Sequence, residues 1–548
     1  MSMKCAFFLS FFLLFVSCRV NIPTAILGSA RSKSFQISAG NIQVPHERTL
    51  LWNDTSEFAD SVIREWADMP MADWENDGKT AAPRILLARL HANKDIPETN
   101  KCIQSLVPRG VTGSKWWLNP KGDYDFTLTT LTTILFLFGE KPEILYPETM
   151  DHLVNVLLTD SGDKFRKHVP HTLGLIIDTE NHILMTEGSR YLKNQWLALH
   201  GDTSPQFNNE QNGMELRLHS FLNGLTTMGL YEFNSLPYIG YTIAALLNLE
   251  AFGSEQIRTD ARNVLDYMNW CYALGSLELN HFPPMRRRYE KAGVRDFSNN
   301  YHTAFMTTWL HFFKDTLPLP NRVLNHAHTF VASCMPYRPA DEVVKWQFDK
   351  GNGYFVQFGH GPGATPEIYT AGKNYLLSAG GSNRGESSHI VPRPICLFLK
   401  DGADAVEETV HLYGPTEDYM KWNNTGVFQN LAVAAGPVHI PENLHPLSVN
   451  GNWASYLLQD SITLIVYSSE DFGLFLVEEN VETKAYFESI MKLNPDELKL
   501  TSSFVSHNQQ VIQYNVHAPH RLWVIQSENG VEVNRKVDSW PLMNGVFR

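Results

Sequence analysis

The chain has 548 residues, of which 43% are hydrophobic and 12% aromatic, and its formal net charge is −13. This length predicts more than one domain, and the hydrophobic content is ordinary for a globular protein with large cores. An acidic protein lacks the broad basic surface that nucleic-acid binding requires, so we expect no nucleic-acid partner.

Residues 1–18, MSMKCAFFLSFFLLFVSC, predict a secretory signal peptide. Lys4 supplies the charged start, and the apolar run 6–16 is too short to span a bilayer. The ending Phe15-Val16-Ser17-Cys18 resembles a bacterial lipobox, which would make Cys18 a lipid-anchored residue. Cleavage near Ser17 or further along, without lipidation, is the alternative. We therefore expect a secreted protein, periplasmic or anchored at the outer membrane if the source is bacterial.

Residues 19–345 are expected to form a helical domain. Apolar residues recur at three- and four-residue steps in runs joined by short Gly, Pro or Asp turns. Pairs of antiparallel helices without intervening strands indicate a helical array, although no solenoid repeat is present. The expected helices cover residues 83–94, 127–139, 150–160, 179–202, 213–229, 238–253, 255–275 and 301–315.

Residues 346–548 are expected to form an antiparallel β-sandwich. From about residue 350, short runs rich in Val, Ile, Tyr and Phe are separated by Gly, Asn and Pro at roughly ten-residue intervals. This pattern is typical of sandwiches and barrels. The boundary is expected within 336–353, so the predicted fold class is multidomain α+β.

The cysteines predict neither a metal knuckle nor a dense disulfide framework. After Cys18 there remain Cys102, Cys271, Cys334 and Cys396, widely spaced and without a CxxC pair. We expect buried free thiols and no bound metal.

The start of the helix expected at 179–202, TENHILMTEGSRYLKNQWLALHGD, carries an unusual pair, Asn181 and His182. Hydrogen-bond acceptors at 178–180 are explained by the free N–H groups and the positive dipole end of a helix start. That explanation does not require an amide and an imidazole in succession. Asn181 and His182 are therefore candidate site residues.

A second unusual segment, LYEFNSLPYIGYT (230–242), places Tyr238 in the first turn of the next helix. The positive end of the helix dipole makes a tyrosinate easier to form, so Tyr238 is a candidate base. Packing on an amphipathic helix is the alternative. The interval between Asn181 and Tyr238 is 57 residues (238 − 181), about one helical hairpin with its loops. The two segments are therefore expected to line one cleft.

This Asn-His pair, the later Tyr and the order of domains resemble the polysaccharide lyases of the alginate-lyase and heparinase II/III-like group. The resemblance covers most of the mature chain in architecture and only these residues in motif. It implies an incomplete (α/α) toroid followed by a β-sandwich, and β-elimination at a uronic acid of an acidic polysaccharide or oligosaccharide. By resemblance Asn181 would hydrogen-bond the substrate carboxylate, and His182 would be neutraliser or base. Tyr238 would be base, acid or both.

Relatives in this group often carry a His-rich zinc segment in the β domain. No convincing metal-ligand spacing occurs in this sequence, so we expect no cofactor. The aromatic content suits stacking on sugar rings, and it equally suits a large aromatic core.

The segment NHFPPMRRRYEKAG (280–293) is the strongest basic cluster and is read as a subsite for an acidic substrate, with a solvated loop as the alternative. A Gly/Ser-rich loop (378–394) is expected to reach over the cleft, and His360 is a weaker candidate for the same role. The predicted substrate-binding residues are Glu180, Tyr241, Arg286, Arg287, Arg288, Tyr289, Arg384 and His389.

Two other functions remain open. A glycoside hydrolase on a similar helical toroid would use two carboxylates, drawn from Asp178, Glu180, Glu187 and Glu232. A non-catalytic, glycan-binding lipoprotein would bind sugars without any product. A serine hydrolase is not indicated, because no GxSxG elbow occurs in a strand–turn–helix setting. P-loop and dinucleotide-binding fingerprints are also missing from the settings they require.

Overall fold

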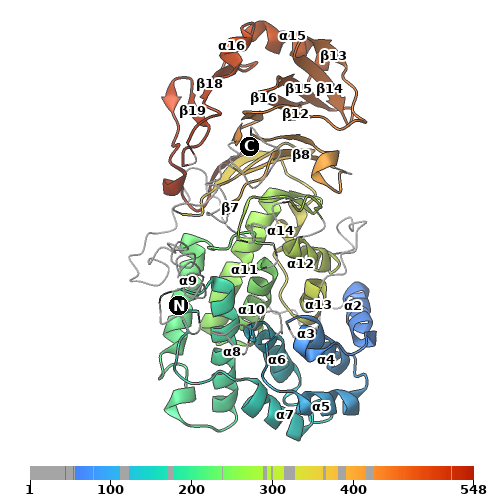
Figure 1. The fold of residues 1–548 in the computed structure, drawn as a ribbon, viewed down its shortest axis with the longest axis vertical. Coiled ribbons are helices and arrows are strands. Elements are labelled where there is room, and N and C mark those ends of the chain that lie inside the picture. Colours follow the sequence, from blue (N-terminus) through green and yellow to red (C-terminus); the bar gives the residue numbers. More distant parts are fainter. Residues whose placement is uncertain are drawn as a thin grey trace, which may run out of the picture.

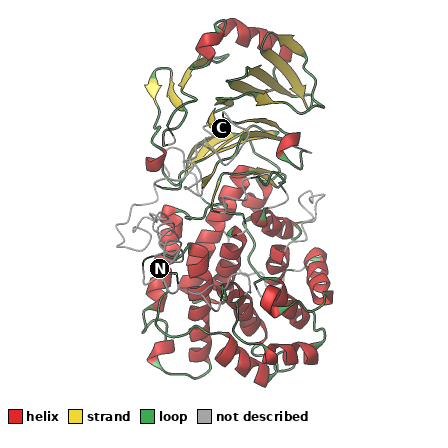
Figure 2. Ribbon diagram, viewed as in Figure 1, coloured by secondary structure: helices red, strands yellow, loops and turns green. Residues whose placement is uncertain are grey.

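The structure, a computed structural model, describes residues 44, 54, 56–77, 79–110, 122–166, 168–169, 175, 177–236, 238–287, 293–297, 300–313, 327–361, 366–380, 390–400, 402–414, 425–519 and 521–548. Within these residues the fold is α+β, with helices at one end of the molecule and antiparallel sheets at the other (Figures 1 and 2). The predicted leader, including Cys18, lies outside the described residues. None of the helices in these ranges is long and apolar enough to cross a membrane.

Seven helices of the first part form a closed circuit of contacts (Figure 1). Each packs against the next, and the last packs back against the first. In order they are α2 (Glu57–Asp68), α4 (Ala81–His91), α6 (Asp125–Phe138), α8 (Glu180–Leu199), α10 (Ile239–Phe252), α12 (Tyr301–Leu310) and α13 (Ala327–Cys334).

Other helices pack around this circuit. The long α9 (Met214–Met228) and α11 (Glu255–Gly275) contact each other, and they also contact α8 and α10 respectively. The remainder are short: α3 (Trp74–Asp77), α5 (Ile96–Ser105), α7 (Pro147–His152) with the π-helical turn η3 (Leu153–Leu157), η4 (Pro205–Phe207) and α14 (Asp341–Lys345).

Helix α6 shows why these segments tolerate so many β-branched residues. It is buried along nearly its whole length, so tertiary packing outweighs the modest helix propensity of threonine. The hydroxyls of Thr132 and Thr133 donate to carbonyls one turn earlier, at 2.8 and 3.1 Å, which satisfies them inside the core.

A seven-stranded antiparallel sheet forms the middle layer of the molecule. Its order is β12-β9-β8-β6-β5-β4-β21. The strands are β4 (Tyr354–Phe358), β5 (Glu367–Ala371), β6 (Tyr375–Gly380), β8 (Ile395–Leu399), β9 (Val410–Leu412), β12 (Val438–His439) and β21 (Asn544–Phe547).

A six-stranded sheet, β10-β11-β16-β15-β14-β13, and a four-stranded sheet, β17-β18-β19-β20, complete the second part. The former contains β10 (Thr425–Phe428), β11 (Leu431–Ala434), β13 (Ser448–Asn450), β14 (Trp453–Leu458), β15 (Ile462–Ser468) and β16 (Gly473–Glu479). The latter contains β17 (Ser503–Val505), β18 (Val511–Tyr514), β19 (Ile525–Glu528) and β20 (Val531–Glu532).

The middle sheet is buried on both faces. Tyr369 and Leu376 join the core of the helical part, whereas their neighbours Ile368 and Leu377 join a second core shared with the six-stranded sheet. This assignment follows the two-residue period of a strand. Strands β5 and β6 are buried at every position, and their polar side chains, Glu367, Thr370 and Ser378, are buried with the apolar ones.

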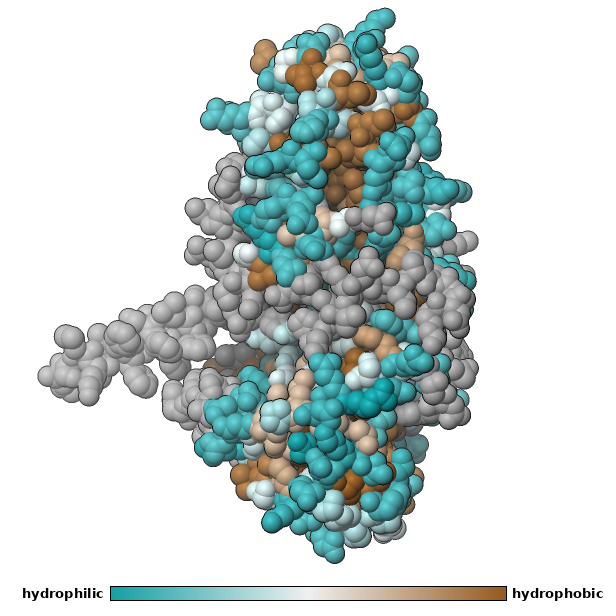
Figure 3. Space-filling view, turned by 90° about the vertical axis from the view of Figure 1, so that its right-hand side faces the viewer, coloured by the Kyte–Doolittle hydropathy of each residue, from teal (hydrophilic) through white to brown (hydrophobic). Residues whose placement is uncertain are grey.

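The surface of the sheet-rich end carries apolar side chains framed by hydrophilic ones (Figure 3). Leu447, Val449 and Leu498 are among the exposed large apolar residues of this part.

Some expectations need correction. Short strands interrupt the helical part after α11, namely β1 (Ser276–Leu277), β2 (Asn280–His281) and β3 (Met285–Arg286), whereas no strand was expected there. Two helices, α15 (Thr483–Leu493) and α16 (Glu497–Leu500), lie among the strands of the second part.

The four cysteines among the described residues are free thiols. Cys334 and Cys396 are buried, but Cys102 and Cys271 are only partly buried, so burial holds for two of the four. At the expected boundary, α14 ends at Lys345 and β4 begins at Tyr354.

Candidate active site

Helices α6, α8 and α10 run parallel and begin at the same end of the helical part. At their starts, Asp125 of α6 bonds to His182 of α8. At their far ends, Phe136 of α6 packs on Trp196 of α8 and on Phe252 of α10. The positive ends of three helix dipoles therefore lie close together, which favours negative charge at this end.

His182 and Asp125 form a buried ion pair in the first turns of α8 and α6. Asp125 accepts a hydrogen bond from Nδ1 of His182, and the side chains are 4% and 17% exposed. Burial alone would lower the pKa of His182, but the Asp125 carboxylate outweighs it and raises the pKa to about 9. Burial would raise the pKa of Asp125, and the charge of His182 lowers it instead. At neutral pH His182 is thus a cation whose further hydrogen bonds use Nε2.

Asn181 is fully buried beside this pair. Its Oδ1 accepts a hydrogen bond from the hydroxyl of Thr179, whereas its Nδ2 has no hydrogen-bond partner among the described residues. Thr179 is the N-cap residue of α8, as expected from the sequence, but its hydroxyl bonds to Asn181 instead of to a helix N–H. The cap thus orients the amide and leaves a buried donor.

Glu180, predicted to bind substrate, is 4% exposed and holds the loop before α10. Its Oε1 accepts from the backbone N–H of Glu232 at 2.6 Å. Burial, and then the neighbouring Glu232, raise the pKa of Glu180 to about 8. Burial also raises the pKa of Glu232, against the attraction of Arg287, whose Nη1 lies 2.9 Å from Oε1.

The basic cluster lies against these acids and against Tyr238. The guanidinium of Arg287 is 5.4 Å from the ring centre of Tyr238, which is the N-cap residue of α10. Arg286 is buried, and its guanidinium lies 4.1 Å from the ring centre of Tyr231. Arg287 has a φ of 78°, a conformation that non-glycine residues rarely adopt.

A short strand pair anchors this cluster to the sheet-rich part. Strand β3 pairs with β7 (Ile390–Val391), so that Arg286 lies opposite Ile390. Arg288, Tyr289, Arg384 and His389 lie outside the described residues.

Tyr241 and His360 make packing contacts next to the site. Tyr241 lies edge-to-face against Phe126 and His328, and burial raises its pKa to about 12. His360 stacks on Phe233 at 3.7 Å, and its Nε2 lies 2.7 Å from Oε1 of Glu367. His360 therefore joins the sheet-rich part to the loop before α10.

No protein-family model matches the chain, and none of the curated proteins matches it. The assignment of function therefore depends on the geometry of the site. In the ranges that the structure describes, His, Cys, Asp and Glu side chains do not gather in groups of three that would suit a metal ion.

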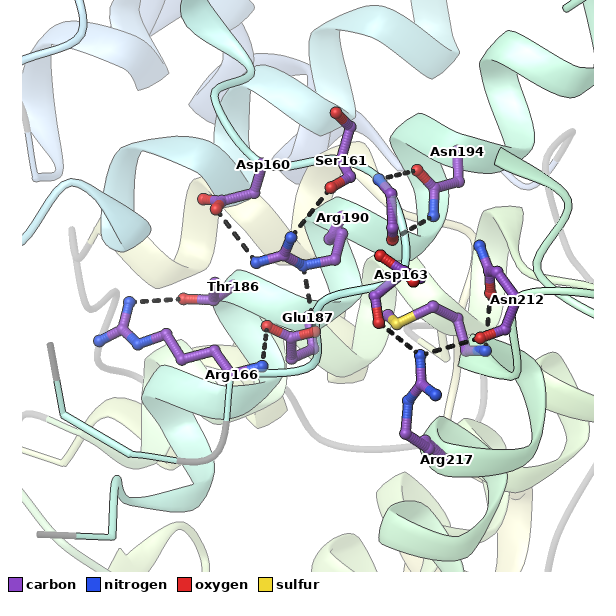
Figure 4. A network of polar contacts seen from close by, with 12 residues as sticks. Asp160, Ser161, Asp163, Arg166, Thr186, Glu187, Arg190, Asn194, Asn212 and Arg217 are labelled. Atoms are coloured by element: carbon purple, nitrogen blue, oxygen red, sulfur yellow. Dashed lines mark hydrogen bonds and ion pairs between the residues drawn. The ribbon is translucent and has the colours of Figure 1, made fainter. Parts of the chain in front are cut away.

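A loop upstream of α8 is held against that helix by polar side chains, of which Glu187, Arg190 and Asn194 are buried (Figure 4). Arg190 bonds to Asp160 at 3.1 Å and pairs with Glu187 at 3.2 Å. Glu187 is fully buried and accepts from the backbone N–H of Arg166 at 2.9 Å. Burial raises the pKa of Glu187 to about 7 although Arg190 is close. Arg166 also pairs with Asp178 at 2.7 Å, so the network positions the first turn of α8.

Sequence reasoning missed Asp125 and Arg166. Asp125 precedes His182 by 57 residues, the interval that also leads from Asn181 to Tyr238. Counting 57 residues back from His182 reaches the start of α6, the preceding helix of the circuit, and would have identified Asp125. Arg166 lies in a loop without periodicity, so no comparable signal points to it.

Proposed function

We propose that this protein is a secreted or surface polysaccharide lyase that cleaves a uronic-acid-containing glycan by β-elimination. The observation that carries the proposal is the charged His182–Asp125 pair at the joint start of three helices, next to Asn181 and to the Tyr238–Arg287 contact. These are the groups that elimination at a uronate needs in one place.

The reaction breaks the C5–H and C4–O4 bonds and forms a C4–C5 double bond. The substrate carboxylate must be neutralised so that the C5 proton becomes acidic. With a pKa of about 9, His182 is charged at neutral pH and suits this role better than that of a base. Tyr238 then remains for proton transfer from C5 and to the departing O4.

Asn181 is the neutral donor of the proposed site. Its unpartnered Nδ2 would bind most strongly as charge grows on the carboxylate in the transition state. Because the side chain is fully buried, a substrate reaches it only by displacing the groups that cover it.

The architecture supports the same proposal. We interpret the closed circuit of α2, α4, α6, α8, α10, α12 and α13 as the inner part of an (α/α) toroid. We interpret the two sheets that share one core as a β-sandwich. Both are features that the resemblance to polysaccharide lyases implies.

A glycoside hydrolase is the second candidate. In its favour, Glu180 has a raised pKa of about 8 next to Glu232, as a general acid beside a carboxylate would. Against it, both carboxylates are already engaged, because Glu180 accepts from the backbone N–H of Glu232, and Glu232 pairs with Arg287. The other two candidate carboxylates, Asp178 and Glu187, are also buried, and they pair with Arg166 and Arg190 respectively.

The test is ultraviolet absorbance of the unsaturated uronate. Protein lacking residues 1–18 is incubated with alginate, heparan and chondroitin types, hyaluronan, glucuronans and rhamnose-glucuronate glycans. We expect absorbance to rise with one substrate class, and Tyr238→Phe to reduce the rate by about a hundredfold or more, the usual effect of losing a general acid or base. Asn181→Ala should also reduce it strongly.

Tyr146→Phe is the matched control, because Tyr146 is likewise the N-cap residue of a helix, α7, and lies outside the site. It should leave the rate unchanged. New reducing ends without a rise in ultraviolet absorbance would contradict the lyase proposal and support the glycoside hydrolase. Binding without product would favour the glycan-binding lipoprotein.

A further inference from the structure

A small cavity lies inside the circuit of helices, below the candidate active site. Helices α4, α6, α8, α10 and α13 all contribute to its wall, which includes Arg84, Phe126, Thr129 and Tyr241. Phe126 directly follows Asp125, and Tyr241 lies one turn after Tyr238, so the cavity begins one layer below the site. Its free volume of about 10 Å³ leaves room for about one water-sized particle.

Arg84 places an uncompensated charge on this cavity. The residue is 2% exposed, and among the described residues it makes no ion pair and its Nε and Nη1 atoms have no hydrogen-bond partner. A guanidinium does not lose its proton in a protein. Burial of a charge without an ionic partner costs several kcal/mol. The ring of Tyr241, whose centre lies 6.0 Å from the guanidinium carbon, offsets only part of this cost, so a counter-ion would be strongly favoured.

Other buried arginines in the same part are compensated. Arg190 faces Glu187, and Arg262 faces Glu250. Burial also lowers the pKa of Arg84, with no carboxylate among the groups that oppose the effect.

A second donor lines the same cavity. The buried hydroxyl of Thr129 has no hydrogen-bond partner within the described ranges. Two further threonines of α6, Thr130 and Thr133, are also in the wall, and the rest of the wall includes the apolar Leu87, Met185 and Val331. Donors without acceptors in an apolar wall are the setting in which an anion binds strongly.

We propose that this cavity binds one small inorganic anion of about chloride size, held by the guanidinium of Arg84 and the hydroxyl of Thr129. The volume excludes a sugar ring, and a halide, which is slightly larger than water, fits when the side chains of the wall move outward by a small amount. The anion neutralises Arg84 and connects α4 to α6 directly below the candidate active site. This proposal does not depend on the lyase activity, because its readout is stability.

The test compares thermal unfolding of the mature protein in sodium chloride, bromide, acetate and gluconate at equal ionic strength. We expect Tm to rise saturably with chloride or bromide, by about 2 °C or more over gluconate. Arg84→Met should abolish this halide dependence. In gluconate the variant should be at least as stable as the wild type, because a buried unpaired charge has been replaced by an apolar side chain.

Lys79→Met is the matched control. Lys79 lies 4.6 Å from the ring centre of Phe126, does not line the cavity and is paired with the partly exposed Asp123, so its loss should leave the halide dependence intact. Equal stability of the wild type in chloride and gluconate would overturn the proposal. Stabilisation by acetate alone would also overturn it, since it would assign the cavity to a carboxylate.

A second measurement covers the case in which Arg84→Met does not fold. Crystals of the wild-type protein grown in sodium bromide should show an anomalous scattering peak beside the Arg84 guanidinium. A bromide-free cavity under these conditions would contradict the proposal.

Discussion

At the scale of residues, the Asp125–His182 pair determines the charge of the candidate site. Each partner moves the pKa of the other in the direction that keeps both charged, against the cost of burial. The folded state therefore binds the His182 proton more tightly than the unfolded chain does. This difference contributes stability that is fully present below about pH 6.5 and is lost as the pH rises through about 9.

We predict that Asp125→Asn weakens this dependence on pH. The amide can still accept the hydrogen bond from Nδ1, but it carries no charge to hold the proton. Between about pH 6 and pH 9.5 the wild type should lose free energy of unfolding on the order of 3 kcal/mol from this pair, and the variant much less. Urea unfolding at the two pH values measures the difference.

Asp260→Asn provides the control, because the pair His219–Asp260 has the same chemistry with a histidine side chain that is 35% exposed. Solvent screens such a pair, so the pH dependence should remain close to that of the wild type. An Asp125→Asn protein with the full wild-type slope would show that another group binds the proton.

Residues of the candidate site were predictable from the sequence where they recur at an interval of about one helical hairpin. The pair at 181–182 and Tyr238 follow from unusual chemistry at helix starts, and the same interval reaches Asp125. Arg84 opens an ordinary helical run, RILLARLH (84–91), in which an arginine reads as a solvated residue. Its isolation from any carboxylate is a property of packing among five helices, which local sequence does not contain.

At the scale of elements, the approach of α10 to α13 depends on a glycine. A Cβ on Gly240, in the first turn of α10, would lie 2.5 Å from Nε2 of His328 in α13. His328 packs against the rings of Tyr241, Tyr301 and Phe305, so it has little freedom to move. Because Gly240 has no side chain, the start of α10 next to Tyr238 can lie directly against the His328 ring.

We predict that Gly240→Ala lowers the free energy of unfolding by about 1–3 kcal/mol, the usual cost of overpacking a core. Gly188→Ala in α8 is the matched control, because its Cβ would meet Leu249 at 3.6 Å, an ordinary contact. There the gain in helix propensity should stabilise the protein by about 0.5–1 kcal/mol. Urea unfolding measures the free energy of unfolding of both variants. Equal effects of the two substitutions would show that close packing at Gly240 does not limit the residue there.

The long helices were predictable because their apolar periodicity extends over several turns, and α11 occupies its expected range 255–275. Length alone does not decide this, because α5 and α12 both have ten residues and only α12 was expected. The run FQNLAVAAG (428–436) contains the turn of the β10–β11 hairpin and all of β11, with Phe428 opposite Leu431. Gln429 makes this turn with a φ of 51°. Asn430, the other residue of the turn, is a turn signal that could have separated the two strands.

At the scale of the whole molecule, the middle sheet belongs to two cores at once. On β6, Leu376 packs with the helices, and its neighbour Leu377 packs with the six-stranded sheet. Disorder in either core would therefore expose one face of the same strands. This arrangement links the stability of the helical part to that of the sheets.

We predict that Leu376→Ala and Leu377→Ala shift one common unfolding transition. Each removes a fully buried leucine side chain, which costs about 2–5 kcal/mol. Because the sheet is shared, differential scanning calorimetry should show a single transition that moves to lower temperature in both variants. Two separate transitions, with each variant affecting a different one, would show that the cores melt independently.

The burial of β5 and β6 on both faces also limits how this protein can diverge. A half-exposed strand has one face on which substitutions accumulate at little cost, and these two strands have none. Their sequence should thus drift more slowly than that of strands such as β18, which alternates exposed and buried positions. Across distant descendants of the same ancestor, the middle strands would be the last part of the sheet-rich region to lose a recognisable sequence.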